Sequence, residues 1–254
     1  MWSIALFMAG TFILYLMIIK SRAKKIRQAR LEEDYNRVIA KFLFAVVFED
    51  LPYGEVAEDA EYQLLSGRKS FRKHLMASVM NLHQNYSGSY AQKLEIFYAD
   101  TGLQKDSYKK LKSRKWEIRC SGVKELAEMN VAKAFDRLVK ITKSRKKTLK
   151  ITALHACIKI NGIKGIVHLK AHKDPIDQWT KVNIIAALKS QEVEDTGIED
   201  LLDSKNATVV ALGLMVIESL KLTRKATFVE QLIQTAPDNL IRLEAQSVLQ
   251  SLTT

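Results

Sequence analysis

The sequence has few of the residues that make tight turns or covalent cross-links. Only 10 glycines and 3 prolines occur in 254 residues, and no window of four to eight residues alternates convincingly between apolar and polar positions. An all-β fold, which needs many tight turns, is therefore excluded. Two cysteines give no disulfide framework and fit a reducing compartment. With 47% hydrophobic and 27% charged residues, the chain is not disordered and can bury a sizeable core.

Sequence patterns typical of catalysis are also missing. The run GIKG at 162–165 is too short for a phosphate-binding loop and lacks its Ser or Thr. His168 and His172 share a helix face at a spacing of four, but no third metal ligand is fixed beside them. Cys157 has His155 two residues away, on a different helix face, so no base is paired with the thiol. We therefore expect no enzymatic activity, no cofactor and no metal.

The N-terminal segment is apolar and uncharged. Residues 2–19 read WSIALFMAGTFILYLMII, and as a helix they would extend roughly 27 Å, enough to cross a bilayer core. No basic residue precedes the segment, and no cleavage pattern follows it. We predict an uncleaved transmembrane anchor over 1–19 and a basic juxtamembrane segment over 20–30. The alternative is an amphipathic N-terminal helix or one buried against a partner.

The bases that follow this segment lie on one side of it only. The positive-inside rule then predicts a single-pass protein of the inner (cytoplasmic) membrane, with its N-terminus outside and its C-terminal body in the cytoplasm. The same bases are also expected to attract anionic lipid. They are Lys20, Arg22, Lys24, Lys25, Arg27 and Arg30.

Residues 31–115 have helical periodicity and form a predicted helical lead-in. Expected helices near 71–85 and 90–101 are separated by turn signals, and Gly102 suits a helix C-terminus. The stretch 31–62 carries nine acidic and two basic residues. These acids form either a solvated face or an acidic docking surface.

From Trp116 onward the chain repeats. Each unit has a position that is mostly basic, then a mostly small residue three positions later, then an apolar residue seven positions later. Successive units are offset by 31, 31, 29 and 32 residues. The three series are Arg119, Lys150, Lys181, Val210 and Arg242; Gly122, Ala153, Ile184, Gly213 and Ala245; and Leu126, Cys157, Leu188, Ile217 and Leu249.

This pattern resembles HEAT repeats, in which antiparallel helix pairs stack into a solenoid. The resemblance covers 116–254 and departs from the family form at Val210, which lacks the base, and at Ile184, which is large. Together with the lead-in, the chain resembles bacterial membrane-anchored HEAT-repeat proteins. The resulting prediction is an all-α fold, with an N-terminal transmembrane helix followed by a HEAT-like α-solenoid of antiparallel helix pairs.

Two basic clusters, one repeat apart, are the strongest functional signal. Residues 104–150 carry sixteen bases and five acids, and stacked repeats would place the clusters side by side. The predicted partner-binding residues are Lys109, Lys110, Lys112, Arg114, Lys115, Lys143, Arg145, Lys146, Lys147 and Lys150.

The expected function is that of a membrane-tethered cytoplasmic scaffold or regulatory subunit that binds a membrane-associated protein partner. The family resemblance implies a membrane enzyme, such as a glycosyltransferase, or a transport component. The alternative is a nucleic-acid-binding protein that uses the same bases with Tyr108 and Trp116, the aromatic residues interleaved among them. We consider nucleic acid the less favoured partner.

Overall fold

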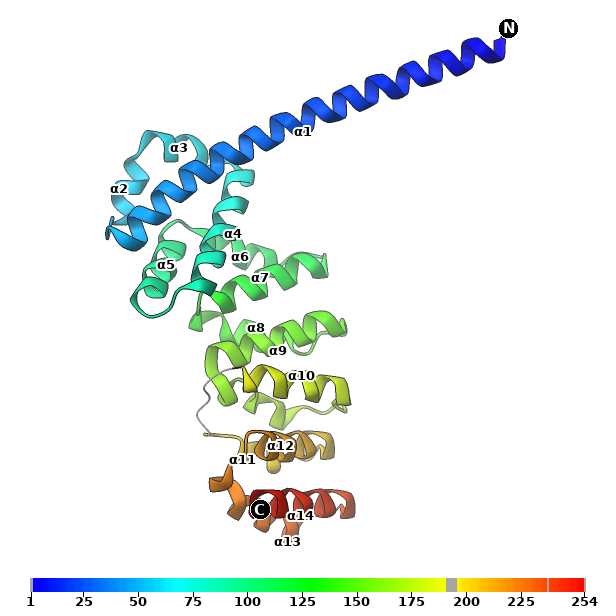
Figure 1. The fold of residues 1–254 in the computed structure, drawn as a ribbon. Coiled ribbons are helices and arrows are strands. Elements are labelled where there is room, and N and C mark those ends of the chain that lie inside the picture. Colours follow the sequence, from blue (N-terminus) through cyan, green and yellow to red (C-terminus); the bar gives the residue numbers. More distant parts are fainter. Residues whose placement is uncertain (1, 191–195, 237, 254) are drawn as a thin grey trace. The chain divides into compact units, whose positions relative to one another are not determined.

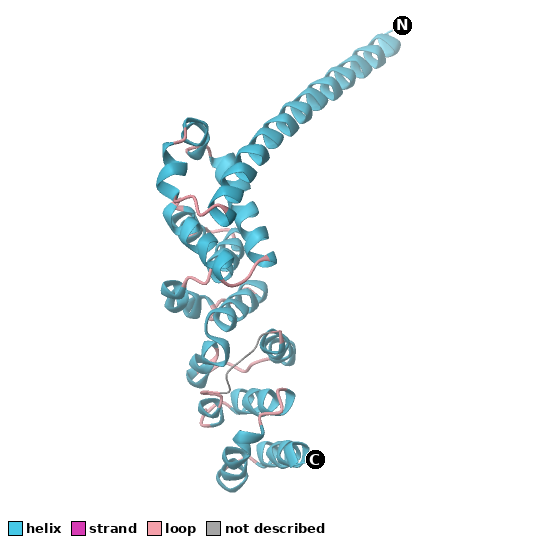
Figure 2. Ribbon diagram, turned by 60° about the vertical axis from the view of Figure 1, so that its left-hand side comes forward, coloured by secondary structure: helices cyan, strands magenta, loops and turns pink. Residues whose placement is uncertain are grey.

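The computed structural model describes residues 2–190, 196–236 and 238–253, and within 2–13 it describes the side chains of 2, 7, 8, 10 and 12 only. Every regular element in these ranges is a helix and none is a strand, which confirms the all-α prediction (Figure 2). The chain divides into two compact units, residues 1–103 and 104–254. Each is described by itself.

The first unit begins with one long helix. α1, Trp2–Phe48, is followed by α2 (Tyr53–Glu58), α3 (Ala60–Ser66), α4 (Lys69–Asn85) and α5 (Ser89–Asp100) (Figure 1). The bounds of α4 and α5 agree with the expected helices, and Gly102 follows with a φ of +71°, a conformation that glycine adopts without steric cost. The turn predicted at 51–54 lies between α1 and α2.

The predicted transmembrane anchor over 1–19 is wrong by the criterion that the described residues allow. Among them, no helix is both long and apolar enough to cross a membrane. α1 does not end at Ile19; it continues as a 47-residue helix through the six bases and into the acidic stretch. The described side chains before Lys20 contain no unbroken apolar window, and positions 3–6, 9, 11 and 13 lie outside them. The single-pass inner-membrane location is withdrawn with the anchor.

Aromatic packing holds the first unit together. The inner face of α1 packs on α4 and α5. Tyr35 meets Phe71 edge-to-face at 5.4 Å between ring centroids, and Tyr62 meets both Phe42 and Phe71 at 5.7 and 6.0 Å. Such edge-to-face pairs contribute about 0.5–1.5 kcal/mol each beyond the area they bury. These four rings are almost fully buried.

The second unit is a stack of long helices joined by shorter ones. Its long helices are α7 (Trp116–Glu128), α9 (Lys147–Asn161), α10 (Gln178–Lys189), α12 (Ala207–Ser219) and α14 (Asn239–Thr253), and each packs on the next (Figure 1). The elements between and before them are α6 (Leu103–Leu111), η1 (Ala132–Ala134), α8 (Phe135–Ile141), η2 (Gly162–Gly165), η3 (Val167–Ala171), α11 (Glu199–Leu202), η4 (Thr223–Lys225) and α13 (Ala226–Thr235).

Small residues in the long helices let the short helices approach closely, as the repeat pattern predicted. A Cβ added to Gly122 of α7 would lie 2.7 Å from the backbone oxygen of Ser107 in α6. At Gly213 of α12 it would lie 3.0 Å from a methyl carbon of Leu202 in α11. Ile184 is large but fully buried, so this position does not demand a small residue in every unit.

Gly165 is the glycine at which we expect a side chain to be least tolerated. A Cβ there would press on the backbone carbonyl of Cys157 and lie 2.9 Å from Ile158 N. Backbone atoms cannot rotate away, so Gly165→Ala should lower the free energy of unfolding by about 2–3 kcal/mol. Urea unfolding measures this loss.

Gly67→Ala is the matched control for that substitution. Gly67 has no atom within 4 Å of the added Cβ and has a right-handed helical φ of −77°. Its replacement should leave stability unchanged or raise it slightly. Equal losses in the two variants would contradict the close approach at Gly165.

Candidate functional site: the basic edge of the second unit

The predicted partner-binding bases lie where a short helix gives way to a long one. Lys109 and Lys110 belong to the last turn of α6, and Lys112, Arg114 and Lys115 lie between α6 and α7. The other five lie between α8 and α9 or in the first turns of α9. Both groups therefore lie at the N-terminal ends of long helices.

Side-chain contacts bring these helix ends together along one edge. The Lys146 ammonium lies 4.6 Å from the Trp116 ring centroid, which links the beginnings of α9 and α7. The Lys147 ammonium lies 4.7 Å from the Trp179 ring, which links α9 to α10. Asn206, before α12, donates hydrogen bonds to the carbonyls of His172 and Asp174, before α10, at 3.1 and 2.9 Å. The N-terminal ends of four long helices thus form a continuous edge.

The same short turn leads into α7 and α9. Ser113 Oγ accepts a hydrogen bond from the backbone N–H of Lys115 at 3.1 Å, and Ser144 Oγ accepts one from Lys146 at 3.2 Å. The tripeptide Ser-Arg-Lys occurs at both places, 31 residues apart. This repeat is a sequence signal for the edge that the spacing of the bases alone did not use.

Lys115 and Lys146 are the N-cap residues of α7 and α9, and neither side chain caps its helix. Along the same edge, Asp177 and Asn206 cap α10 and α12 by accepting hydrogen bonds from Thr180 N and Thr208 N at 2.9 and 3.0 Å. Asp and Asn are favoured at N-caps, and a cation near a helix N-terminus is disfavoured by the helix dipole. Two of the four helices therefore begin with residues that local stability does not select.

Not all of the predicted bases are free to bind a partner. Lys110 is half-buried and pairs with Glu125, a buried carboxylate that also accepts hydrogen bonds from Ser107 at 2.6 Å and Ser121 at 2.9 Å. The Lys110 contact is therefore structural. Lys109 pairs with Asp106 at 3.6 Å, beside the same helix.

The remaining bases, which we call the basic edge, lack carboxylate partners except at one position. Within the part of the chain that the structure describes, only Lys147 of this set forms an ion pair, with Asp177 at 3.3 Å. The basic edge consists of Lys112, Arg114, Lys115, Lys143, Arg145, Lys146, Lys147 and Lys150, flanked by Trp116 and Trp179.

Trp179 is the functional candidate that the sequence analysis missed. Its side chain is 50% exposed although it contacts Lys147, so one part of the ring stays open to solvent. Tyr108, which was predicted to be interleaved with the bases, instead carries the Arg137 guanidinium at 4.7 Å from its ring centroid. Both contacts join residues about 30 positions apart, which sequence spacing does not specify.

Two histidines lie beside the basic edge. Burial lowers the pKa of His168 and of His172, and the nearby Lys143 lowers both further. Lys150 also lowers the pKa of His172, whereas Asp174 opposes the shift. His168 Nε2 lies 3.2 Å from Thr142 Oγ1.

Catalytic chemistry has little support in this unit. Burial raises the pKa of the Cys157 thiol to about 12, so the thiolate is scarce at neutral pH. Among the described residues, no group of three or more His, Cys, Asp and Glu side chains could hold a metal ion.

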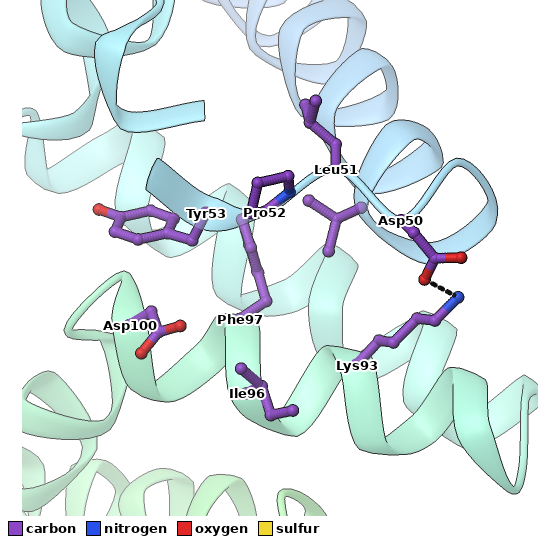
Figure 3. A pocket seen from close by; sticks show the side chains of 9 residues that line it. Asp50, Leu51, Pro52, Tyr53, Lys93, Ile96, Phe97 and Asp100 are labelled. Carbon is purple, nitrogen blue, oxygen red and sulfur yellow. Dashed lines mark ion pairs between the residues drawn. The ribbon is translucent and has the colours of Figure 1, made fainter. Parts of the chain in front are cut away.

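The first unit has a small apolar cavity of about 120 Å³ between the end of α1 and α5. Figure 3 shows Pro52, Tyr53, Ile96 and Phe97 around it, with Lys93 paired to Asp50 at 2.6 Å on one side. This volume would admit only a few atoms, and its single ion pair is already complete. We therefore find no catalytic arrangement there.

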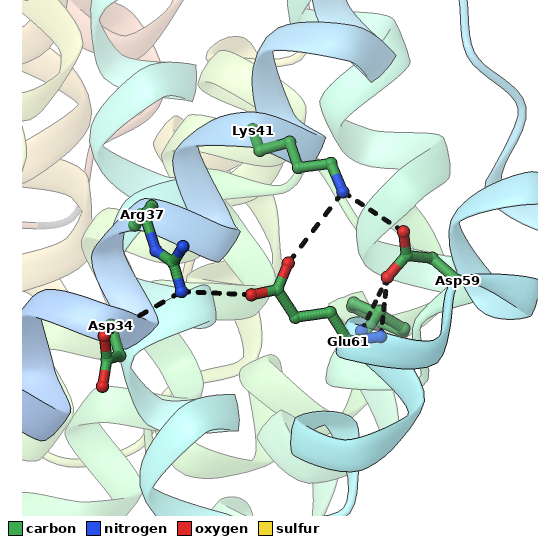
Figure 4. Close-up of polar contacts among 6 residues, drawn as sticks. Asp34, Arg37, Lys41, Asp59 and Glu61 are labelled. Carbon is green, nitrogen blue, oxygen red and sulfur yellow. Dashed lines mark hydrogen bonds and ion pairs between the residues drawn. The ribbon is translucent and has the colours of Figure 1, made fainter.

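The acidic stretch of the first unit forms internal contacts. Asp59 caps α3 and pairs with Lys41 at 3.2 Å, while Glu61 pairs with Arg37 at 3.2 Å and, more weakly, with Lys41 at 4.0 Å (Figure 4). Asp34 also approaches Arg37, at 3.9 Å. Both bases of this stretch are thus used within the unit.

Comparison of the chain with protein-family models, with curated proteins and with solved structures finds no match in any of the three. The class that the chain itself defines is an all-helical stack with one basic edge.

Removing the ammonium of Lys110 should destabilise the chain because Glu125 would stay buried without its counter-charge. We expect Lys110→Met to lower the free energy of unfolding by about 3 kcal/mol. Lys109→Met is the control, since Lys109 is 78% exposed and its ion pair contributes about 0.5 kcal/mol or less. Urea unfolding of both variants measures the difference, and similar values would contradict a structural role for Lys110.

The buried histidines should make stability depend on pH. The pKa values of His155, His168 and His172 are lowered mainly by burial, so below about pH 6.5 the unfolded chain binds protons that the folded chain resists. Their contribution is complete above that pH and is lost as the pH falls toward the lowered native values. His168→Gln should reduce the loss measured by urea unfolding between pH 7.5 and 5.5. An unchanged pH dependence would argue against a buried neutral imidazole.

Proposed function

We propose that the chain is a binding protein, a scaffold or regulatory subunit, whose basic edge holds an acidic segment of a protein partner. The observation that carries this proposal is the pair of uncapped lysines, Lys115 and Lys146, at the N-termini of α7 and α9. Residues that oppose local stability are most often retained for function. Asp177 and Asn206 indicate that the same edge accommodates ordinary caps.

The spacing of the basic edge suits an extended partner segment. Packed helices lie about 8–10 Å apart, and an extended chain advances about 3.3 Å per residue. An acidic segment would therefore pass one helix end for about every three residues. Lys115, Lys146 and Lys147 are placed to meet successive acidic side chains, and the exposed part of Trp179 offers an apolar contact at one end.

Single-stranded nucleic acid is the second candidate, and the half-exposed Trp179 is the observation that favours it. An indole ring beside lysines can stack on a base while the lysines meet phosphates. The two candidates differ in salt dependence, because nucleic acid binding releases condensed counterions from the strand.

The test uses the full chain and two fluorescent probes, a 20-residue Asp/Glu-rich peptide and a 20-nucleotide single-stranded DNA. We expect the peptide to bind in about 100 mM salt, and Lys115→Asp combined with Lys146→Asp to weaken it about tenfold or more. The same double variant should unfold at equal or higher urea concentration, because Asp is a good N-cap. Loss of binding with retained stability separates function from folding.

Lys164→Asp combined with Lys189→Asp is the matched control. Both lysines are exposed and lie at the C-terminal ends of α9 and α10, away from the basic edge. This variant should bind the peptide as the parent does. An unaffected Lys115/Lys146 variant would refute the basic edge as the binding surface, and binding of DNA without binding of peptide would favour the second candidate.

A further inference from the structure

Within the basic edge, Lys143, Lys150 and His172 gather positive charge without a carboxylate to balance it. Other shielded lysines of the second unit each face an acid: Lys110 faces Glu125, Lys170 faces Asp200 and Asp203 at 3.3 and 3.2 Å, and Lys225 faces Glu199 at 2.8 Å. Lys150 is also half-buried, yet no ion pair with it or with Lys143 is found among the described residues.

The His172 ring is held in place but only partly satisfied. Its backbone N–H donates to the Leu169 carbonyl at 2.8 Å, and its own carbonyl accepts from Asn206 at 3.1 Å. The ring atom Nε2 is buried and has no hydrogen-bond partner among the described residues. The charged groups around this ring are Lys150 of α9, Lys143 before α9, and Asp174 of its own loop, and His168 of η3 lies beside it. A buried polar atom without a partner costs about 1–3 kcal/mol, so its retention calls for an explanation.

We infer that Lys143, Lys150 and His172 form a phosphate-binding site, and that the acidic segment bound at the basic edge carries a phosphoserine or phosphothreonine there. This inference rests on the proposed function and names the chemistry of the partner. Two ammonium groups and one imidazolium N–H are donors without an acceptor. A phosphate monoester supplies a charge of about −1.5 to −2 at neutral pH and three acceptor oxygens, whereas a carboxylate supplies one charge and two oxygens.

Proton binding and phosphate binding are coupled at such a site. The two lysines and burial disfavour protonation of His172 in the free protein. A dianion placed between the lysines reverses the local field and favours the imidazolium, whose N–H then donates to a phosphate oxygen. Phosphate binding should therefore strengthen as the pH falls from 7.5 toward 6.5, while the phosphate keeps most of its charge.

The first experiment compares two peptides of identical acidic sequence, one with a central phosphoserine and one with serine, by fluorescence anisotropy on the full chain. We expect the phosphopeptide to bind at least tenfold more tightly. His172→Gln should reduce this preference below threefold and leave the serine peptide within twofold of the parent affinity. His155→Gln is the matched control, because His155 faces the Asn183 carbonyl at 3.2 Å and not the basic edge, and it should keep the full preference.

The second experiment titrates inorganic phosphate into the full chain and follows the His172 imidazole by NMR, with chloride at equal ionic strength as the reference. Phosphate should raise the pKa of His172 by about one unit or more. This readout does not depend on the sequence of any peptide and needs no variant to fold.

The outcomes separate the inference from the function on which it rests. Equal affinity for the two peptides would overturn the phosphate site and leave the proposed function standing. Absence of any pKa change at His172 in phosphate would likewise overturn the site. Failure of both peptides to bind would refute the proposed function, and the phosphate titration would still decide whether the site exists.

Discussion

The close approach of short helices to long ones is the constraint on which the second unit depends. At Gly122 and Gly213 the backbone of one helix lies against the next, and at Gly165 the chain presses on the backbone of α9. These contacts leave each short element just enough room to return the chain, so that the next long helix begins at the same edge as the last. Without this regular return, Trp116 and Lys146 would not meet. The basic edge is thus a consequence of backbone packing.

Charge placement along that edge works against stability, and the stack compensates for it only in part. Cations at helix N-termini are disfavoured by about 0.3–1 kcal/mol each. Contacts of Lys146 with Trp116 and of Lys147 with Trp179 and Asp177 offset some of this cost. Nothing comparable stabilises Lys115. The cost is small against the total stability of a domain, which is why such residues can persist where binding requires them.

Much of the helical architecture could be predicted from sequence, because periodicity and turn residues act locally. The helices at 69–85 and 89–100 and the close approaches at Gly122 and Gly213 were predictable in this way. The role of Lys110 was not, since its partner Glu125 lies fifteen positions away and meets it only after α6 packs on α7. Trp179 was missed for the same reason. The transmembrane prediction failed because it considered the apolar segment alone, whereas α1 continues without a break into the first unit.

The two charged regions of the chain differ in how their charges are used, and this difference decides which of them binds a partner. In the first unit, Asp59 and Glu61 neutralise Lys41 and Arg37 across two elements, so these acids are committed to folding (Figure 4). An acidic docking surface there would have to break contacts that hold α3 to α1. At the basic edge, Lys143 and Lys150 have no such commitment. Binding an anion there costs no existing ion pair and relieves repulsion between like charges, so it is the edge, and not the acidic stretch, that has free energy to gain from a partner.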